Sequence, residues 1–523
     1  MSEQAHPPQI NRVYGAVTSI LAGVIHTARR ALSPLHNAWQ RLRAEPLSVL
    51  RARIFLGVAV IAISIFWGMA TAVLENNALY LAMGLILSVF ILIDFRVGVI
   101  ALIVLLPIAD TKIFPHQLLG ITGLNPLNML MMATLFSYGV RRFFGGTRHR
   151  FIPREIWWLY IFPITCAAAL GAMHVGEIPG FVSHNLDLSF DGTPGYLRDL
   201  LIRPMYSVLF ALLVAAAVVD TRQMEGFLVA GLISLWLLIL TVIIFFLSSG
   251  ASLSDISGAG GASRSFFNPL GLHANAAGRM FAIAFGMLLF LASSYKSFLQ
   301  RVVLWASIGA TLLATLITFS RGSYLLLLII GLLYLRALKG SHRLQIMVLG
   351  LPAMLLALPR AVYDRFLFGV GTGADLNTLS SGRTEEIWQP LIPEILNSPI
   401  VGHGLSSILW SDAMKSGSIL VVGHPHNAFL KSLLDMGLLG TVLVLIFGWR
   451  VWKRMQQLSQ EPLLEPKLRQ LFAGAAAALL AFTIAGVSGS SFDPVADQLF
   501  LWFAIGLMYG TASRLETTRS LHG

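Results

Sequence analysis

Long apolar segments constrain the fold of this chain more than any other feature of its sequence. A helix that crosses a bilayer needs about 20 mostly apolar residues, and the sequence holds about fourteen such segments. Only 12% of the 523 residues are charged, whereas soluble domains carry about 25% charged residues. A chain with so little polar surface cannot coat a water-soluble globule. The sequence therefore predicts an all-α, polytopic integral membrane protein.

Charge placement predicts how these segments cross the membrane. The expected spans lie near 54–73, 78–94, 97–112, 124–140, 155–173, 200–219, 224–248, 275–293, 301–319, 322–337, 343–360, 427–448, 468–487 and 495–512. Basic residues such as Arg141, Lys296 and Arg450 fall in alternate loops. Because basic loops stay in the cytoplasm, we expect an even number of spans and two cytoplasmic termini. The net charge of +12 is then mostly an anchor against anionic headgroups, so membrane lipids, and not nucleic acid, are the expected partner.

The spans and loops divide the chain into four expected parts. These are a basic cytoplasmic segment at 1–53, the first seven spans with an outward loop at 174–199 in 54–260, a core at 261–448 with the long outward loop 361–426, and the last spans with a short cytoplasmic tail at 449–523. An amphipathic helix is expected from Glu385 to Leu396, and Asp493 is expected to cap the last helix. The single cysteine, Cys166, lies in an apolar run, which excludes a disulfide within the chain.

The outward loops hold arginine and histidine residues that the topology does not explain. They are Arg198 and Arg203 around the start of a span, Arg264 in a Gly/Ser-rich loop, Arg321 in a tight turn, Arg383 in the long loop, and His424, His426 and Asn427 at the end of that loop. Each has a structural interpretation as an interface anchor, a loop brace or a helix cap. No Cys, Asp or Glu accompanies the histidines at ligand spacing, so we expect no metal site.

Outward arginines and histidines without acids or metals favour two kinds of function. Arginine binds phosphate oxygens through a bidentate fork, and neutral histidine can remove a proton from an attacking hydroxyl. One function is therefore transfer of a glycan from a lipid pyrophosphate donor, which carries its energy in the membrane. The alternative is a transporter or flippase that binds a lipid-linked glycan or another anion. Transporters commonly carry inverted repeats, and none is evident here.

Ordered motifs in the second half of the chain resemble a known family. His426 and Asn427 are followed by nine residues and then by Gly437, Leu438, Leu439 and Gly440. Upstream lie Ser381–Thr384, Trp388, Asn397, Pro399, Gly402 and Gly404, then the turn Ser320–Gly322, and the segment Arg264–Pro269, in which Phe266 replaces the usual glycine. Over about residues 260–445 the chain resembles the bacterial O-antigen ligase and O-antigen (Wzy-type) polymerase family, which marks 261–448 as a ligase-like core.

This resemblance implies a metal-independent, inverting glycosyltransferase without cofactor, in the bacterial inner membrane with its active site facing the periplasm. The donor would be an undecaprenyl-pyrophosphate-linked glycan. By carry-over, His426 would activate the acceptor hydroxyl, and Arg264 and Arg321 would clamp the pyrophosphate. Further substrate contacts would come from Arg198, Arg203, Arg383, His424 and Asn427.

The resemblance leaves the acceptor open. A ligase transfers the glycan to lipid A–core, whereas a polymerase transfers it to another lipid-linked repeat unit in O-antigen or exopolysaccharide biosynthesis. The histidine motif favours a ligase, and the number of spans and the long loops favour a polymerase. A ligase that glycosylates proteins is a third, smaller alternative. Envelope polysaccharide assembly proteins are candidate partners.

Overall fold

The computed structural model describes most of the chain from residue 76 onward. The described residues are 58, 76–109, 111–118, 121–122, 125–145, 151–188, 190–219, 221, 224–252, 266–338, 340, 360, 362–363, 375, 377, 380, 382–489 and 491–522. The chain divides into two units, Met1–Met83 and Gly84–Gly523, and the contacts below all lie in the second. The expected segment 1–53, the residue Arg264, and nearly all of the expected spans 54–73 and 343–360 lie outside the described residues.

The regular secondary structure of the described residues is helical, apart from one short hairpin. Seven helical segments are long and apolar enough to cross a membrane: Arg154–Ala172, Gly192–Val219, Glu225–Ser248, Ala274–Ser294, Phe298–Ile317, Ala428–Ser459 and Pro466–Ser488. Two shorter apolar helices are Tyr80–Ile93 and Phe95–Ile108. The prediction of a multi-pass helical membrane protein is confirmed. The count of fourteen spans and the cytoplasmic termini stay predictions.

The element bounds are as follows. The long helices are α3 (Asn76–Ile93), α4 (Phe95–Leu105), α5 (Pro126–Gly145), α7 (Phe162–Ala172), α10 (Arg203–Val219), α11 (Glu225–Ser248), α14 (Ala274–Leu291), α15 (Phe298–Ile317), α16 (Arg321–Ala337), α23 (Ala428–Ser459), α24 (Pro466–Ala485) and α25 (Leu499–His522). Short helices in the loops are α8 (Gly180–Asn185), α9 (Gly192–Leu197), α21 (Gln389–Asn397) and α22 (Asp412–Lys415). Strands β1 (Gln117–Leu118) and β2 (Ile121–Thr122) pair antiparallel, with Gln117 opposite Thr122.

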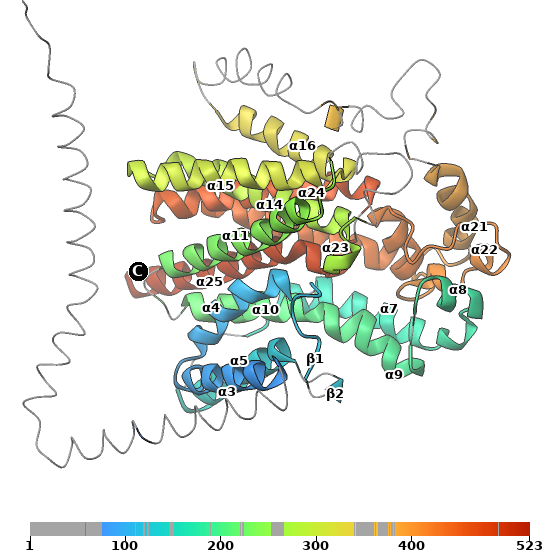
Figure 1. Ribbon diagram of the computed structural model, residues 1–523, viewed down its shortest axis with the longest axis horizontal. Coiled ribbons are helices and arrows are strands. Elements are labelled where there is room, and N and C mark those ends of the chain that lie inside the picture. Colours follow the sequence, from blue (N-terminus) through green and yellow to red (C-terminus); the bar gives the residue numbers. More distant parts are fainter. Residues whose placement is uncertain are drawn as a thin grey trace, which may run out of the picture. The chain divides into compact units, whose positions relative to one another are not determined.

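Small residues let the long helices of the second unit pack closely. A Cβ added at Gly510 of α25 would lie 2.5 Å from the Cβ of Val218 on α10, and one at Gly474 of α24 would lie 2.7 Å from the carbonyl oxygen of Gly286 on α14. Inside a lipid phase the hydrophobic effect does not drive helices together, so close van der Waals packing of this kind stabilises their association instead. Figure 1 shows α10, α11, α14, α15 and α25 side by side, with α8, α21 and α22 beyond one end of them.

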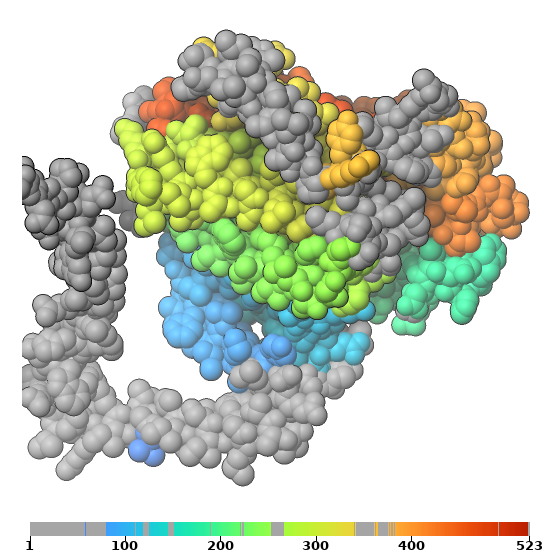
Figure 2. Space-filling view, turned by 45° about the horizontal axis from the view of Figure 1, so that its top comes forward, coloured from blue at the N-terminus to red at the C-terminus, as the bar shows by residue number. Residues whose placement is uncertain are grey.

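At this end the 174–199 loop meets the long loop. The amine of Lys415 lies 2.9 Å from a carboxylate oxygen of Glu177, and the backbone N–H of Leu405 donates to the carbonyl of Ala167 at 2.9 Å. Figure 2 shows the two loop regions packed directly against each other. The expected span 200–219 in fact begins at Gly192, because α9 continues through a π-helical turn, Arg198–Ile202, into α10.

Two expectations about local structure have different outcomes. The expected helix from Glu385 to Leu396 is confirmed as a π-helical turn, Thr384–Trp388, followed by α21. The expected cap at Asp493 is wrong, because the last helix begins at Leu499 after a 3-10 turn. Asp493 instead pairs with Lys431 of α23 at 2.9 Å. The two residues are far apart in the sequence, so the sequence alone could not predict this ion pair.

Candidate active site

A break in α23 defines one side of the site. Gly437 has φ 61° and ψ −169°, so the helix is interrupted there. Backbone of the 399–404 segment fills the break: the N–H of Leu438 donates to Pro399 at 2.8 Å, and the N–H of His403 donates to Leu434 at 2.9 Å. The loop thus satisfies helix groups that have lost their partners within the helix.

Glycines make this insertion feasible. A Cβ at Gly402 would lie 2.5 Å from the nitrogen of Gly437, and a Cβ at Gly437 would lie 2.3 Å from the carbonyl carbon of Ile400. Both residues also have positive φ, 72° and 61° respectively, where a side chain is strained. Two glycines of the recognised motifs therefore dock the long loop onto α23, which is a structural role.

The two histidines precede α23 and contact each other. Their ring centroids lie 4.1 Å apart, and the backbone N–H of His426 donates to Nδ1 of His424 at 3.2 Å. His426 has φ 54°, in the left-handed region that histidine tolerates better than most residues. Because Nδ1 of His424 accepts this bond, the proton of the neutral ring lies on Nε2.

His424 is held in its neutral form. Desolvation by the surrounding protein atoms lowers its pKa to about 4, although the residue as a whole is exposed, and the charge of Lys431 acts in the same direction. Arg279, His273 and Arg383 add further positive charge nearby. At neutral pH the ring of His424 is therefore uncharged and can donate a hydrogen bond from Nε2.

Asn427 and Trp388 fix the turn that carries the histidines. The side-chain oxygen of Asn427 caps α23 by accepting from the N–H groups of Phe429 at 3.0 Å and Leu430 at 3.2 Å. The indole N–H of Trp388 donates to the carbonyl of Pro425 at 2.8 Å. The oxygen of Asn427, predicted as a substrate contact, is thus engaged at the helix start.

Segments from distant parts of the chain converge on the turn Ser488–Gly489. The guanidinium of Arg383 donates to the carbonyl of Ser488 at 3.1 Å. A Cβ at Gly489 would lie 3.5 Å from the carbonyl oxygen of His426 and 3.9 Å from Nη1 of Arg383. The start of α16 reaches the same turn, since a Cβ at Gly322, the residue after Arg321, would lie 2.9 Å from Oγ of Ser488.

Residues 306–445 match the family model described as O-antigen ligase. These residues form the O-antigen ligase domain of the chain. The matched segment includes α16, Arg383, the histidine pair and the break in α23, and the match supports the assignment to the O-antigen ligase/polymerase family. No match was found among curated proteins.

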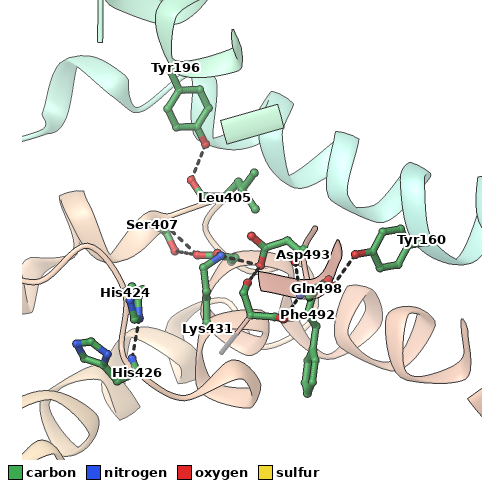
Figure 3. A network of polar contacts seen from close by, with 12 residues as sticks. Tyr160, Tyr196, Leu405, Ser407, His424, His426, Lys431, Phe492, Asp493 and Gln498 are labelled. Carbon is green, nitrogen blue, oxygen red and sulfur yellow. Dashed lines mark hydrogen bonds and ion pairs between the residues drawn. The ribbon is translucent and has the colours of Figure 1, made fainter. Parts of the chain in front are cut away.

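The O-antigen ligase domain is joined to the C-terminal helices by buried charges that the sequence interpretation missed. The amine of Lys431 lies 2.9 Å from Asp493 and 2.9 Å from Asp435, whose other oxygen accepts from the N–H and hydroxyl of Ser407, each at 3.0 Å. Figure 3 shows this network between the histidines and Tyr160. The available signal was an ionisable pair with i,i+4 spacing in an apolar span, which is costly unless paired.

Arg279 was missed in the same way. Its Nε donates to Asp497 at 2.5 Å and its Nη1 donates to the carbonyl of Gly489 at 2.8 Å. Asp497 is only 3% exposed, and an arginine inside the expected span 275–293 is the signal that could have found this pair. Arg279 therefore binds the same Ser488–Gly489 turn that Arg383 contacts.

Other predicted residues lie apart from the contacts above. Arg198 pairs with the adjacent Asp199 at 2.9 Å, Arg203 is exposed at the start of α10, and neither takes part in the contacts at Ser488–Gly489 described above. Their helical segment reaches the long loop through Tyr196, whose hydroxyl donates to the carbonyl of Leu405 at 2.5 Å. Within the described residues, no three His, Cys, Asp or Glu side chains form a group that could hold a metal ion.

Proposed function

We propose that the protein is an inner-membrane glycosyltransferase that transfers a glycan from an undecaprenyl-pyrophosphate donor to a sugar hydroxyl at the periplasmic face. One observation carries the proposal: the backbone of His426, Arg383 and the start of α16 meet at Ser488–Gly489, and all three lie in the O-antigen ligase domain. The groups proposed as general base and as phosphate ligands would thus share one small region.

The proposed reaction is a single displacement. His426 takes the proton of the acceptor hydroxyl, whose oxygen forms a bond to the anomeric carbon. The bond from that carbon to the pyrophosphate oxygen breaks, and undecaprenyl pyrophosphate leaves with the electron pair. The protonated His426 then releases its proton to water. Attack opposite the leaving group inverts the anomeric carbon, and the step needs neither a metal nor a cofactor.

Arginines would stabilise the leaving group. Arg321 is the first residue of α16, so its guanidinium charge adds to the positive end of a long helix, which favours phosphate. A guanidinium carries five N–H donors, so Arg383 can hold Ser488 and a phosphate oxygen together. Arg264 is proposed as a further clamp, with Arg198 and Arg203 as outer contacts of the donor.

His424 and the buried ion pairs would position the base. By accepting the N–H of His426, His424 stabilises the left-handed backbone there, and its Nε2 is available as a donor to the acceptor sugar. Lys431 links the first turn of α23 to Asp493, close after the Ser488–Gly489 turn. The two parts of the site would therefore move together.

The acceptor is tested directly by reconstitution. Purified protein receives the lipid-linked glycan with either lipid A–core or further lipid-linked repeats, once without and once with EDTA. A capped lipid product identifies a ligase and a longer lipid-linked chain identifies a polymerase; both outcomes support the glycosyl transfer step. If a protein that is folded in its detergent or bilayer forms no product with lipid A–core and none with lipid-linked repeats, the proposed function is contradicted. Activity that EDTA abolishes would contradict the metal-free mechanism.

A further inference from the structure

An apolar cavity of about 350 Å³ lies between α23, α24 and α25. Aromatic rings form much of its wall, among them Phe447 and Trp502. Among the polar side chains in the wall, Tyr160, Thr483 and Gln498 bond within the protein: to the carbonyls of Phe492 at 2.8 Å, Leu479 at 2.9 Å and Ser491 at 2.7 Å, respectively. The indole N–H of Trp452 is the buried polar group of the wall that has no hydrogen-bond partner among the described residues. The cavity therefore suits a hydrocarbon.

One wall of the cavity reaches the lipid-facing surface. Trp449 lines it and is 58% exposed, and Val442 and Ile446 on the same helix are also substantially exposed. These apolar side chains belong to a helix that is long and apolar enough to cross the membrane. A hydrocarbon chain can thus enter sideways from the bilayer without passing through water.

The other end of the cavity touches the candidate active site. Phe492 lines the cavity, and its ring lies 4.9 Å from that of Phe429, in the first turn of α23 after Asn427. The next residue, Asp493, pairs with Lys431. Figure 3 shows Phe492 and Asp493 between Tyr160 and the histidine pair. A chain in the cavity would place its polar head beside the residues that hold the histidines.

We propose that this cavity binds the isoprenoid chain of the polyprenyl-pyrophosphate donor. This inference rests on the proposed function and assigns the tail of the substrate, whose head would lie near Arg383 and Arg321. The volume lies at the lower end of the roughly 300–1,000 Å³ typical of small-molecule sites, enough for part of one chain. Donors of this class have a single chain, whereas lipid A and phospholipids have several, which favours the donor as the occupant.

Gly448 is a position from which a larger side chain can be introduced into the cavity. It lines the cavity, and a Cβ built there meets no heavy atom within 4 Å. Gly448→Phe should therefore occupy the space that the chain needs. Gly331→Phe in α16 is the matched control, because its Cβ also meets nothing within 4 Å and it does not line the cavity.

Two donors separate tail binding from the chemical step. Each variant is assayed with an undecaprenyl (C55) donor and with a water-soluble C10 donor carrying the same glycan. Gly448→Phe should raise KM for the C55 donor by roughly three- to tenfold, a modest change because packing alone drives association in lipid. It should leave kcat/KM for the C10 donor unchanged, and Gly331→Phe should change neither. An unchanged KM for C55, or an equal loss with both donors, contradicts the proposal.

A binding readout tests the occupant independently of turnover. Undecaprenyl phosphate with a diazirine near its chain end is photolysed with the wild-type protein in phosphatidylethanolamine vesicles. Label should appear on peptides containing 444–452 or 498–505, fall in Gly448→Phe, and be displaced by unlabelled undecaprenyl phosphate. Equal displacement by added phospholipid would overturn the proposal in favour of bulk lipid. Failure of the proposed function looks different: the wild-type protein would transfer glycan from neither donor.

Discussion

Removal of Lys431 should destabilise the protein strongly, because two buried carboxylates depend on it. Its amine lies 2.9 Å from both Asp435 and Asp493, and the residue is only 8% exposed. Breaking a buried pair by removing one partner costs about 3–5 kcal/mol. We expect Lys431→Met to lower the free energy of unfolding by about this amount. Lys453→Met, an exposed lysine on the same helix, is the control and should change it little.

The pH dependence of Lys431→Met follows from Asp493. Burial raises the pKa of this carboxyl, but the charge and hydrogen bond of Lys431, together with Ser491, outweigh burial and hold the pKa below its usual range. The wild-type protein should therefore lose this stabilisation only below about pH 4. Without Lys431, burial dominates and the pKa rises, so stability falls as pH increases above about 4.

Thermal unfolding in one detergent measures both effects. The deficit of Lys431→Met should be largest at pH 7.5 and clearly smaller at pH 4.5, and adding Asp493→Asn should recover part of it. A deficit below about 1 kcal/mol at pH 7.5, or one that grows on acidification, would refute the assignment of this network as a stabilising buried ion-pair link.

Three further expectations concern the site. Gly402→Ala should lower the free energy of unfolding by more than about 2 kcal/mol, through contact with Gly437 and positive φ, and should speed proteolysis of the long loop; wild-type resistance would contradict the docking role. Arg383→Lys should lower kcat/KM about tenfold or more because the fork is lost, and equal rates would exclude a phosphate contact. His424→Gln should lower kcat while leaving the pH profile between 5 and 8 unchanged, since the pKa of His424 is about 4; a lost ionisation in that range would make His424 the titrating base.

Hydropathy was sufficient to predict the positions of most of the described helices. It failed where irregular backbone extends or interrupts a helix. The span that begins at Gly192 contains a π-helical turn, which no apolar periodicity reveals. The break at Gly437 needs the 399–404 segment to supply hydrogen-bond partners. It is therefore a property of two segments together and cannot be derived from the helix alone.

For the candidate site, the order of the motifs predicted which residues belong to the site, but the residues that they contact could not be predicted. Arg321, Arg383 and His426 were expected to act together, and the structure brings the start of α16, Arg383 and the backbone of His426 to one turn. That turn, Ser488–Gly489, has no motif of its own and was not predicted. Arg279 lies inside an apolar span and not in an outward loop, and a charge at such a position is itself a signal of a functional or paired residue.

The most direct test of the central claim is single-turnover release of undecaprenyl pyrophosphate from a lipid-linked glycan by His426→Ala in a reconstituted bilayer. His184→Ala, an exposed histidine of α8, is the matched control. We expect His426→Ala to stay folded and to bind the donor, but to lose acceptor-dependent release by about 100-fold or more, while His184→Ala releases it at the wild-type rate. Wild-type release by His426→Ala would contradict the assignment of this residue as the base.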